Sequence, residues 1–237
     1  HGGPSGPVDA ATVLIGETAS SDLGRLVACA GDTNGDGYAD LAVRSLTEVS
    51  IYLGSATGLA TMPSVRWPSP APFPGEPPGI AGVGDLDGDG YGDLVLGVRY
   101  PGTEALVHRG SPLGPETTPS WSWSLGGGRN PRAVGSAGDF DGDGHPDVVL
   151  AAPEDGVIAV FRGADSTPSA LPFVSFIGPV GLGGAIATGD FDGDGRADLA
   201  LGNYFDDNMV AVGAGSVSIL RRSADTVRPS APDGSVR

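Results

Sequence analysis

The sequence has no lysine, a single cysteine and no long apolar run. All 13 basic residues are arginine and are outnumbered by 29 acidic ones, so the formal net charge is −16 and nucleic-acid partners are disfavoured. Cys29 stands alone, which excludes an intrachain disulfide and a cysteine-based metal site. Because no stretch approaches the ~18 apolar residues that a membrane helix needs, we expect no membrane insertion.

What the sequence does have is glycine arranged with a period. The chain of 237 residues, 39% of them hydrophobic, is long enough to bury a substantial core. Its 41 glycines and 21 prolines would suggest a disordered chain if they were scattered. Instead, four acidic, glycine-containing segments recur, and their first residues are 53, 54 and 51 positions apart. The segments are 32–40, 85–93, 139–147 and 190–198. A constant period of this length predicts a repeat architecture.

Short apolar runs of strand length flank every acidic segment. A first strand is expected before the segment, as at 26–30 and 185–188. Second strands are expected at 41–43, 94–96, 148–150 and 199–201, and third strands at 49–53, 105–108, 157–161 and 217–220. Three repeats add an aromatic fourth strand, around Trp67, 121–123 and 173–176. Four short strands in each repeat, without helical periodicity, predict an all-β fold, a β-propeller of four blades over residues 11–222.

The chain ends suggest how the propeller is completed. The fourth repeat lacks an aromatic strand, whereas residues 11–15 have its character, so we expect this N-terminal strand to close the last blade. Residues 1–10 are expected to be a flexible segment and 223–237 a tail rich in Pro, Ser and Gly. Two alternatives stay open: four blades of a larger seven- or eight-bladed ring, or half of a dimeric one.

The acidic segments have the composition of cation-binding loops. Numbering each segment from 1 to 9, oxygens at positions 1, 3 and 5, a backbone carbonyl at 7 and a carboxylate at 9 can converge on one hard cation. Glycine at position 6 permits the sharp turn that this requires. The predicted ligands are Asp32, Asn34, Asp36, Tyr38 and Asp40; Asp85, Asp87, Asp89, Tyr91 and Asp93; Asp139, Asp141, Asp143, His145 and Asp147; and Asp190, Asp192, Asp194, Arg196 and Asp198.

Calcium is the cation that this ligand set favours. Carboxylates crowded into nine residues repel one another unless a cation lies among them. Oxygen-only ligands favour Ca²⁺ over Zn²⁺, and Mg²⁺ prefers to keep its waters. An EF-hand is disfavoured because its position 12 needs a glutamate, whereas these segments have Val43, Leu96, Leu150 and Leu201 there. We therefore expect four Ca²⁺ sites.

These loops resemble the FG-GAP repeats of integrin-α-type β-propellers, and the resemblance extends over roughly residues 11–222. Leu23-Gly24 stands where Phe-Gly is usual, and Ala151-Ala152-Pro153 is nearest to Gly-Ala-Pro. The resemblance implies an extracellular or cell-surface protein with a recognition role in adhesion or lectin-like binding, whose partner is an extracellular protein or a glycan. A homo-oligomer is compatible with it.

In a propeller the calcium turns would lie on one face, and the loops that join second to third strands and one blade to the next would lie on the other. The candidate ligand face comprises the inter-blade loop with Arg129 and Arg132 and a set of loop residues between second and third strands. That set is Tyr100, Glu104, Glu154, Asp155, Tyr204, Phe205, Asp206, Asp207 and Asn208. A purely structural calcium-stabilised module, or an accessory domain of a secreted enzyme, is the alternative.

Catalysis is not expected from this chain. The carboxylates are committed to the loops, and His108 falls in a predicted strand. No Gly-x-Ser-x-Gly elbow or phosphate-binding glycine loop is present. The sequence therefore favours a binding protein over an enzyme.

Overall fold

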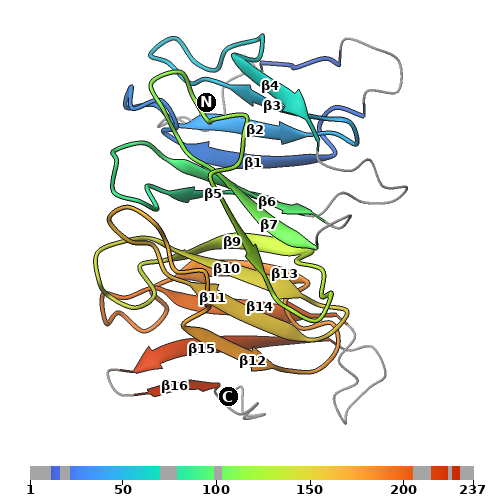
Figure 1. The fold of residues 1–237 in the computed structure, drawn as a ribbon, viewed down its shortest axis with the longest axis vertical. Helices are drawn as coiled ribbons and strands as arrows, with labels where there is room; N and C mark the ends of the chain where they lie inside the picture. The colour runs from blue at the N-terminus through green and yellow to red at the C-terminus, as the bar shows by residue number, and fades with distance from the viewer. Residues whose placement is uncertain are drawn as a thin grey trace, which may run out of the picture.

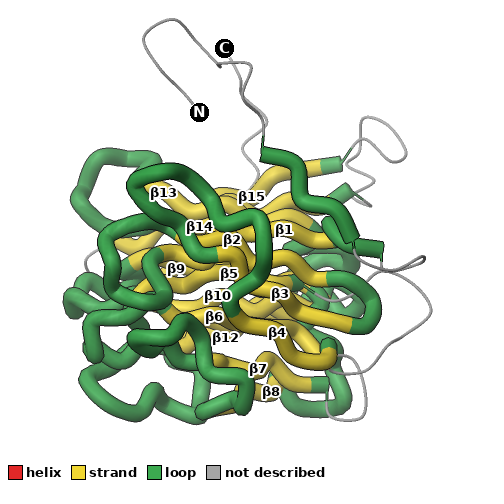
Figure 2. The backbone as a smooth tube through the Cα atoms, turned by 90° about the horizontal axis from the view of Figure 1, so that it is seen from above, coloured by secondary structure: helices red, strands yellow, loops and turns green. Residues whose placement is uncertain are grey.

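The computed structural model describes residues 12–16, 22–69, 79–98, 103–204, 215–223 and 226–229. These residues form strands, turns and loops, and among them no helix is long and apolar enough to cross a membrane. Figure 2 shows the strands running through the interior with loops at both of their ends.

Within the described residues, sixteen strands form four antiparallel sheets of four, each built from consecutive strands. The first sheet contains β1 (Leu26–Gly31), β2 (Asp40–Arg44), β3 (Glu48–Tyr52) and β4 (Val65–Pro68). The second contains β5 (Ile80–Gly84), β6 (Asp93–Val98), β7 (Glu104–His108) and β8 (Trp121–Ser124). The third contains β9 (Ala133–Gly138), β10 (Asp147–Ala152), β11 (Val157–Phe161) and β12 (Val174–Ile177), and the fourth β13 (Ala185–Gly189), β14 (Asp198–Asn203), β15 (Ser216–Ser223) and β16 (Thr226–Pro229). The predicted blades and their strand order are thereby confirmed.

The sheets are stacked face to face, with the first sheet at one end of the molecule and β16 at the other (Figure 1). The first strands run in succession through the stack, since β1 contacts β5, β5 contacts β9, and β9 contacts β13. Among the described elements β13 and β1 make no comparable contact, so the ring expected from the sequence is open between the first and last sheets.

Three apolar clusters hold neighbouring sheets together, one at each interface. The first joins Ile51 and Trp67 to Leu94 and Leu96, the second joins Trp123 to Phe161, and the third is built mainly from aliphatic side chains. The alternation of side chains along each strand places one set against the preceding sheet and the other against the following sheet. The core therefore lies between the blades, and loops remain at the strand ends.

Arg44 is a charged residue within the first interface. Its guanidinium donates to the carbonyl of Gly97 at 2.9 Å and to Ser69 Oγ at 3.1 Å, and the side chain is fully buried. Burial lowers the pKa of Arg44 to about 10, which still leaves the group charged at neutral pH.

The prediction that residues 11–15 complete the last blade is wrong. Residues 12–16 form no strand, and Ile15 and Gly16 line a pocket with Tyr52 and Met62 of the first blade. The fourth place in the last sheet belongs to β16, which pairs with β15 and lies in the segment expected to be a tail. Because only two residues separate β15 from β16, this pairing closes a far shorter loop than pairing with the N-terminus would. Residues 1–10, expected to be flexible, lie outside the described residues.

Candidate metal centres

Each acidic segment folds as a loop between the first and second strands of its blade, around the carboxylate at position 1. Asp85 Oδ1 and Oδ2 accept from the backbone N–H groups of Asp89 at 2.9 Å and Gly90 at 2.8 Å. The same two bonds, from positions 5 and 6, occur at Asp32, Asp139 and Asp190. The turn requires positive φ at positions 4 and 6, which explains why glycine is there in every loop. The four loops therefore have one backbone conformation.

The carboxylates at position 9 are the innermost members of the loops. Asp93 Oδ2 accepts from Leu86 N at 2.8 Å, and its Oδ1 accepts from Gly110 N at 2.8 Å. Asp40 and Asp147 make the equivalent pairs of bonds, and Asp198 accepts from Phe191 N. Burial raises the pKa of Asp93 and of Asp147 to about 7. Both carboxyls are therefore poorly solvated as anions, and a cation within reach of them would favour ionisation.

Three of the four loops gather carboxylates closely enough to hold a metal ion. One oxygen from each member lies within 4.8 Å of the others in three groups: Asp85, Asp87 and Asp93; Asp139, Asp141 and Asp147; and Asp190, Asp192 and Asp194. In the first loop Asn34 replaces the acid at position 3, and its side-chain Nδ2 donates to Asp36 Oδ2 at 3.0 Å. Among the described residues, the three acids of that loop are not gathered as closely as those of the other loops.

Asp87 is the residue whose surroundings fit a bound cation best. The residue is 5% exposed, and its Oδ1 has no hydrogen-bond partner within the described part of the chain. Burial, and then the neighbouring Asp89, raise the pKa of Asp87. A buried, unpartnered carboxylate oxygen beside two further carboxylates fits a hard cation such as Ca²⁺.

The residues at positions 5 and 7 are also fixed within the loops. The backbone N–H at position 7 donates to Oδ1 at position 5 in all four, at 2.9 to 3.0 Å; the pairs are Tyr38 with Asp36, Tyr91 with Asp89, His145 with Asp143, and Arg196 with Asp194. The position-7 side chains lie toward the preceding loop: a Cβ on Gly35 would be 2.8 Å from the Tyr91 ring, and one on Gly142 would be 3.2 Å from Arg196 Nε. Neighbouring loops are therefore in contact across the blade interfaces.

Two arginines at these loops were not anticipated. Arg109 forms an ion pair with Asp87 in the second loop, and Arg162 forms one with Asp141 in the third. Each follows directly after the third strand of its blade. The sequence shows that both arginines follow a third strand, but no short-range pattern pairs either of them with an acid some twenty residues earlier.

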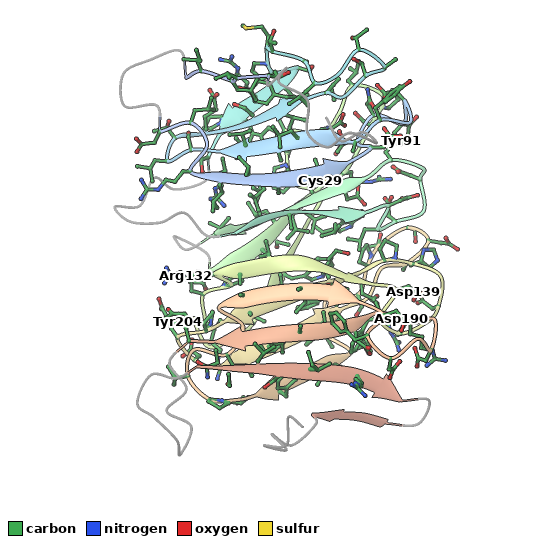
Figure 3. All side chains as sticks on the ribbon, turned by 180° about the vertical axis from the view of Figure 1, so that it is seen from behind. Cys29, Tyr91, Arg132, Asp139, Asp190 and Tyr204 are labelled. Atoms are coloured by element: carbon green, nitrogen blue, oxygen red, sulfur yellow. The ribbon has the colours of Figure 1, made fainter. Side chains whose placement is uncertain are left out.

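The labelled loop residues and the labelled residues of the candidate ligand face lie on opposite sides of the molecule. In Figure 3, Tyr91, Asp139 and Asp190 are on one side of the stack, and Arg132 and Tyr204 are on the opposite side. Arg132 Nη1 is 3.6 Å from Glu154 Oε1, so this ion pair joins an inter-blade loop to the β10–β11 loop. Glu154, Asp155 and Tyr204 are exposed, and Glu104 is half-buried at the start of β7. Tyr100, Phe205, Asp206, Asp207 and Asn208 lie outside the described residues.

The two described histidines, His108 and His145, each contact a side chain from another part of the fold. His108 is buried, and its ring packs on Trp67 with 4.9 Å between centroids. His145 Nε2 is 3.3 Å from Asp165 Oδ1 on the loop side of the third blade. Neither histidine is accompanied by the nucleophile that a hydrolase would need, as far as the described residues show.

Comparison with known proteins agrees with this geometry. A sequence profile of the FG-GAP-like repeat matches residues 32–96, 85–150 and 139–201. Over 172 residues the chain is 31% identical to integrin alpha-7 of Rattus norvegicus, covering 63% of this chain and 14% of the relative. It is 34% identical to integrin alpha-IIb of Mus musculus over 121 residues, which are 46% of this chain and 12% of that protein. Integrin alpha-PS5 of Drosophila melanogaster is 39% identical over 94 residues, 35% of this chain and 9% of the relative.

The three matched repeats together span the acidic loops of all four blades and well over half of the chain. The chain covers less than a sixth of the length of each of these relatives. The observed blades, each with an acidic loop between its first and second strands, are the structural counterpart of that repeat. The chain therefore belongs to the FG-GAP-like repeat family.

Proposed function

We propose that this chain is a calcium-binding recognition module of the extracellular space, with one Ca²⁺ held by each of its four loops. The observation that carries the proposal is the convergence of carboxylate oxygens within 4.8 Å in three loops that share the same turn around position 1. The residues that would hold the ions are those at positions 1, 3, 5 and 9, together with the carbonyl at position 7. In the first loop Asn34 would supply an amide oxygen in place of a carboxylate.

The bound ion would supply the positive charge that these loops otherwise lack. Extracellular calcium modules bind with Kd values of about 10⁻⁴ to 10⁻³ M. At a calcium concentration about tenfold above Kd, one site adds about 1.4 kcal/mol to folding stability. Four such sites would together be comparable with the whole stability of a small domain. Sites of this affinity would be occupied in an extracellular location, because calcium is millimolar there.

Calorimetric titration with Ca²⁺ tests the metal sites. We expect saturable binding, a marked rise in melting temperature with Ca²⁺ and little rescue by Mg²⁺, because Mg²⁺ gives up its waters reluctantly. Asp85→Asn and Asp139→Asn should each weaken one site. Asp155→Asn is the matched control, since Asp155 is exposed and belongs to none of the four loops. An unchanged melting curve in EDTA would refute the calcium proposal.

We further propose that the loops opposite the metal sites bind an extracellular protein or a glycan. The support is the family membership, the integrin alpha relatives and the exposure of Tyr204, Glu154 and Asp155 on that side. Binding to immobilised glycans and matrix proteins in millimolar Ca²⁺, with and without chelator, tests this role. We expect calcium-dependent binding that Tyr204→Ala reduces about tenfold or more. Calcium-stabilised folding without any binding would instead support a structural module.

We propose no catalytic activity. The carboxylates of the described residues that cluster are those of the loops, and His108 is enclosed by the core. Turnover of a glycan or an ester by the purified chain would contradict this view.

A further inference from the structure

Arg109 places a positive charge inside the second acidic loop. Its Nη2 lies 2.5 Å from Asp87 Oδ2 and 2.8 Å from Asp89 Oδ2. The Asp87 side chain is almost completely buried, whereas the Arg109 side chain is about one-third exposed. The guanidinium also lies over the Trp121 ring, 5.5 Å from its centroid. The arginine is thus held from one side by an aromatic ring and contacts two predicted calcium ligands on the other.

Arg162 repeats this arrangement in the third loop. Its Nε forms an ion pair with Asp141 Oδ2, and its guanidinium lies 4.6 Å from the centroid of the Phe173 ring. As in the second blade, the acid at position 3 is the buried partner. The same three-part contact of ring, guanidinium and position-3 carboxylate therefore occurs in two blades.

The register of the sheets shows that one structural position is involved. The residue after position 9 pairs with the residue immediately before the arginine: Leu94 with His108 in the second blade, and Val148 with Phe161 in the third. In the first blade Leu41 pairs with Tyr52, so the equivalent of Arg109 is Leu53. In the fourth blade Leu199 pairs with Leu220, which makes Arg221 the equivalent.

The first blade lacks both the arginine after the third strand and the acid at position 3 of the loop. Where arginine is replaced by Leu53, the acid at position 3 is replaced by Asn34. As a result, loop and arginine together carry the same formal charge of −3 in the first three blades. The fourth blade keeps Asp192 and Arg221, but among the described residues Arg221 is exposed and forms no ion pair with the loop.

We propose that Arg109 and Arg162 are positioning residues of the metal sites: each acts as a resident counter-charge that holds the position-3 carboxylate in place without calcium and weakens calcium binding to its loop. This inference rests on the proposed calcium function. In the metal-free protein the guanidinium offsets the repulsion among four carboxylates. Once an ion is bound, the same positive charge repels it. Arginine thereby stabilises the empty loop relative to the occupied one.

The test compares wild type with the double variant Arg109→Leu/Arg162→Leu, which copies the residue of the first blade. Calorimetric titration should show two of the sites binding Ca²⁺ about tenfold more tightly, because each loses a like charge close to the ion. The chelated variant should melt at a lower temperature than chelated wild type, and this deficit should shrink in saturating Ca²⁺. Arg66→Leu is the matched control, since Arg66 pairs with Glu48 outside the loops and has the same side-chain exposure as Arg109.

Two further variants separate charge from packing. Arg109→Lys/Arg162→Lys keeps the charge and should retain an affinity within about threefold of wild type. Asp87→Asn combined with Arg109→Leu recreates the pair found in the first blade and should remove most of the gain in affinity at the second loop. Equal or weaker calcium binding by the leucine variant would overturn the proposal, and so would an equal loss of stability with and without calcium. If wild type binds no calcium, the proposed function itself fails, and this inference fails with it.

Discussion

His108 is a neutral histidine at the interface of the first two blades. Its Nδ1–H donates to the carbonyl of Glu116 at 2.8 Å, and its buried Nε2 has no hydrogen-bond partner within the described residues. Burial lowers the pKa of His108, and the charge of the nearby Arg44 lowers it further, although Glu116 opposes both effects. Protonation would therefore place an unpaired charge in the core.

Folding stability should consequently fall in acid. Because the folded-state pKa of His108 is below the unfolded value of about 6.5, the unfolded chain binds the proton more readily, and stability is lost as pH falls below about 6.5. Urea unfolding at pH 5 and pH 7.5 in excess Ca²⁺ measures this effect. His108→Phe keeps a ring against Trp67, so the lost hydrogen bond should lower its unfolding free energy by about 1 kcal/mol. The unfolding free energy of this variant should fall less between pH 7.5 and pH 5 than that of wild type. Parallel pH profiles for the two proteins would contradict the assignment.

The acidic loops could be predicted from the sequence because each lies within nine consecutive residues. A local turn forms such a loop without help from the rest of the fold, and the glycines at positions 4 and 6 identify the turn. Arg109 could not be assigned in this way. It reaches Asp89 across 20 residues, through the pairing of β6 with β7. Only the sheet register reveals that the first blade has Leu53 in place of this arginine and Asn34 in place of its acidic partner.

The first strands of the first and second blades, β1 and β5, pack closely on one another. A Cβ on Gly82 of β5 would lie 2.5 Å from the carbonyl oxygen of Cys29 and 2.6 Å from that of Ala30, both in β1. These atoms belong to the backbone and cannot move aside as a flexible side chain could. Glycine at this position therefore sets the distance between the first and second blades.

Gly82→Ala should cost about 2 to 3 kcal/mol, since the added methyl group must separate the two strands. Gly135→Ala in β9 is the matched control, because its new Cβ would make ordinary contacts of 3.6 Å with Val149 and 3.7 Å with Ile186. We expect the control to stay within about 1 kcal/mol of wild type. Equilibrium denaturation in excess Ca²⁺ compares them. Equal stabilities of the two variants would mean that the close approach of β1 and β5 is not maintained in solution.

At the level of strands, the sequence predicted the repeating blades well and the chain ends poorly. The second strands, such as β6 and β10, are buried on both faces and appear as continuous apolar runs. The strand β16 has only four residues, Thr226–Pro229, and no alternation that distinguishes it from a tail. Residues 11–15 have the composition of a strand, yet residues 12–16 form none, because composition alone does not supply a pairing partner.

The whole molecule is a linear stack in which each blade contacts the next. Acidic loops in neighbouring blades touch, so their charges accumulate along one side of the stack (Figure 3). Four calcium ions would halve the formal charge of −16. The sequence predicted this charge and its placement in loops. It did not predict that the ring is open between the first and last blades, because β16, and not the N-terminal segment, pairs with β15.

Salt should therefore stabilise the chelated protein much more than the calcium-loaded one. At 0.1 M salt the screening length is about 10 Å, so added NaCl weakens repulsion between adjacent loops. We expect the melting temperature in EDTA to rise clearly between about 0.02 and 0.5 M NaCl, and to rise less in Ca²⁺, where the bound ions have already reduced the repulsion. Differential scanning calorimetry at both salt concentrations measures this difference.

A variant with asparagine at position 5 of each loop provides the control: Asp36→Asn/Asp89→Asn/Asp143→Asn/Asp194→Asn. The amide oxygen can still accept the N–H bond from position 7, while four negative charges are removed from the loops. In EDTA this variant should melt at a higher temperature than wild type at low salt and should respond less to added NaCl. An equal salt response of wild type with and without calcium would show that loop repulsion does not limit the stability of the stack, and that the stabilising effect of calcium must come from ordering the loops instead.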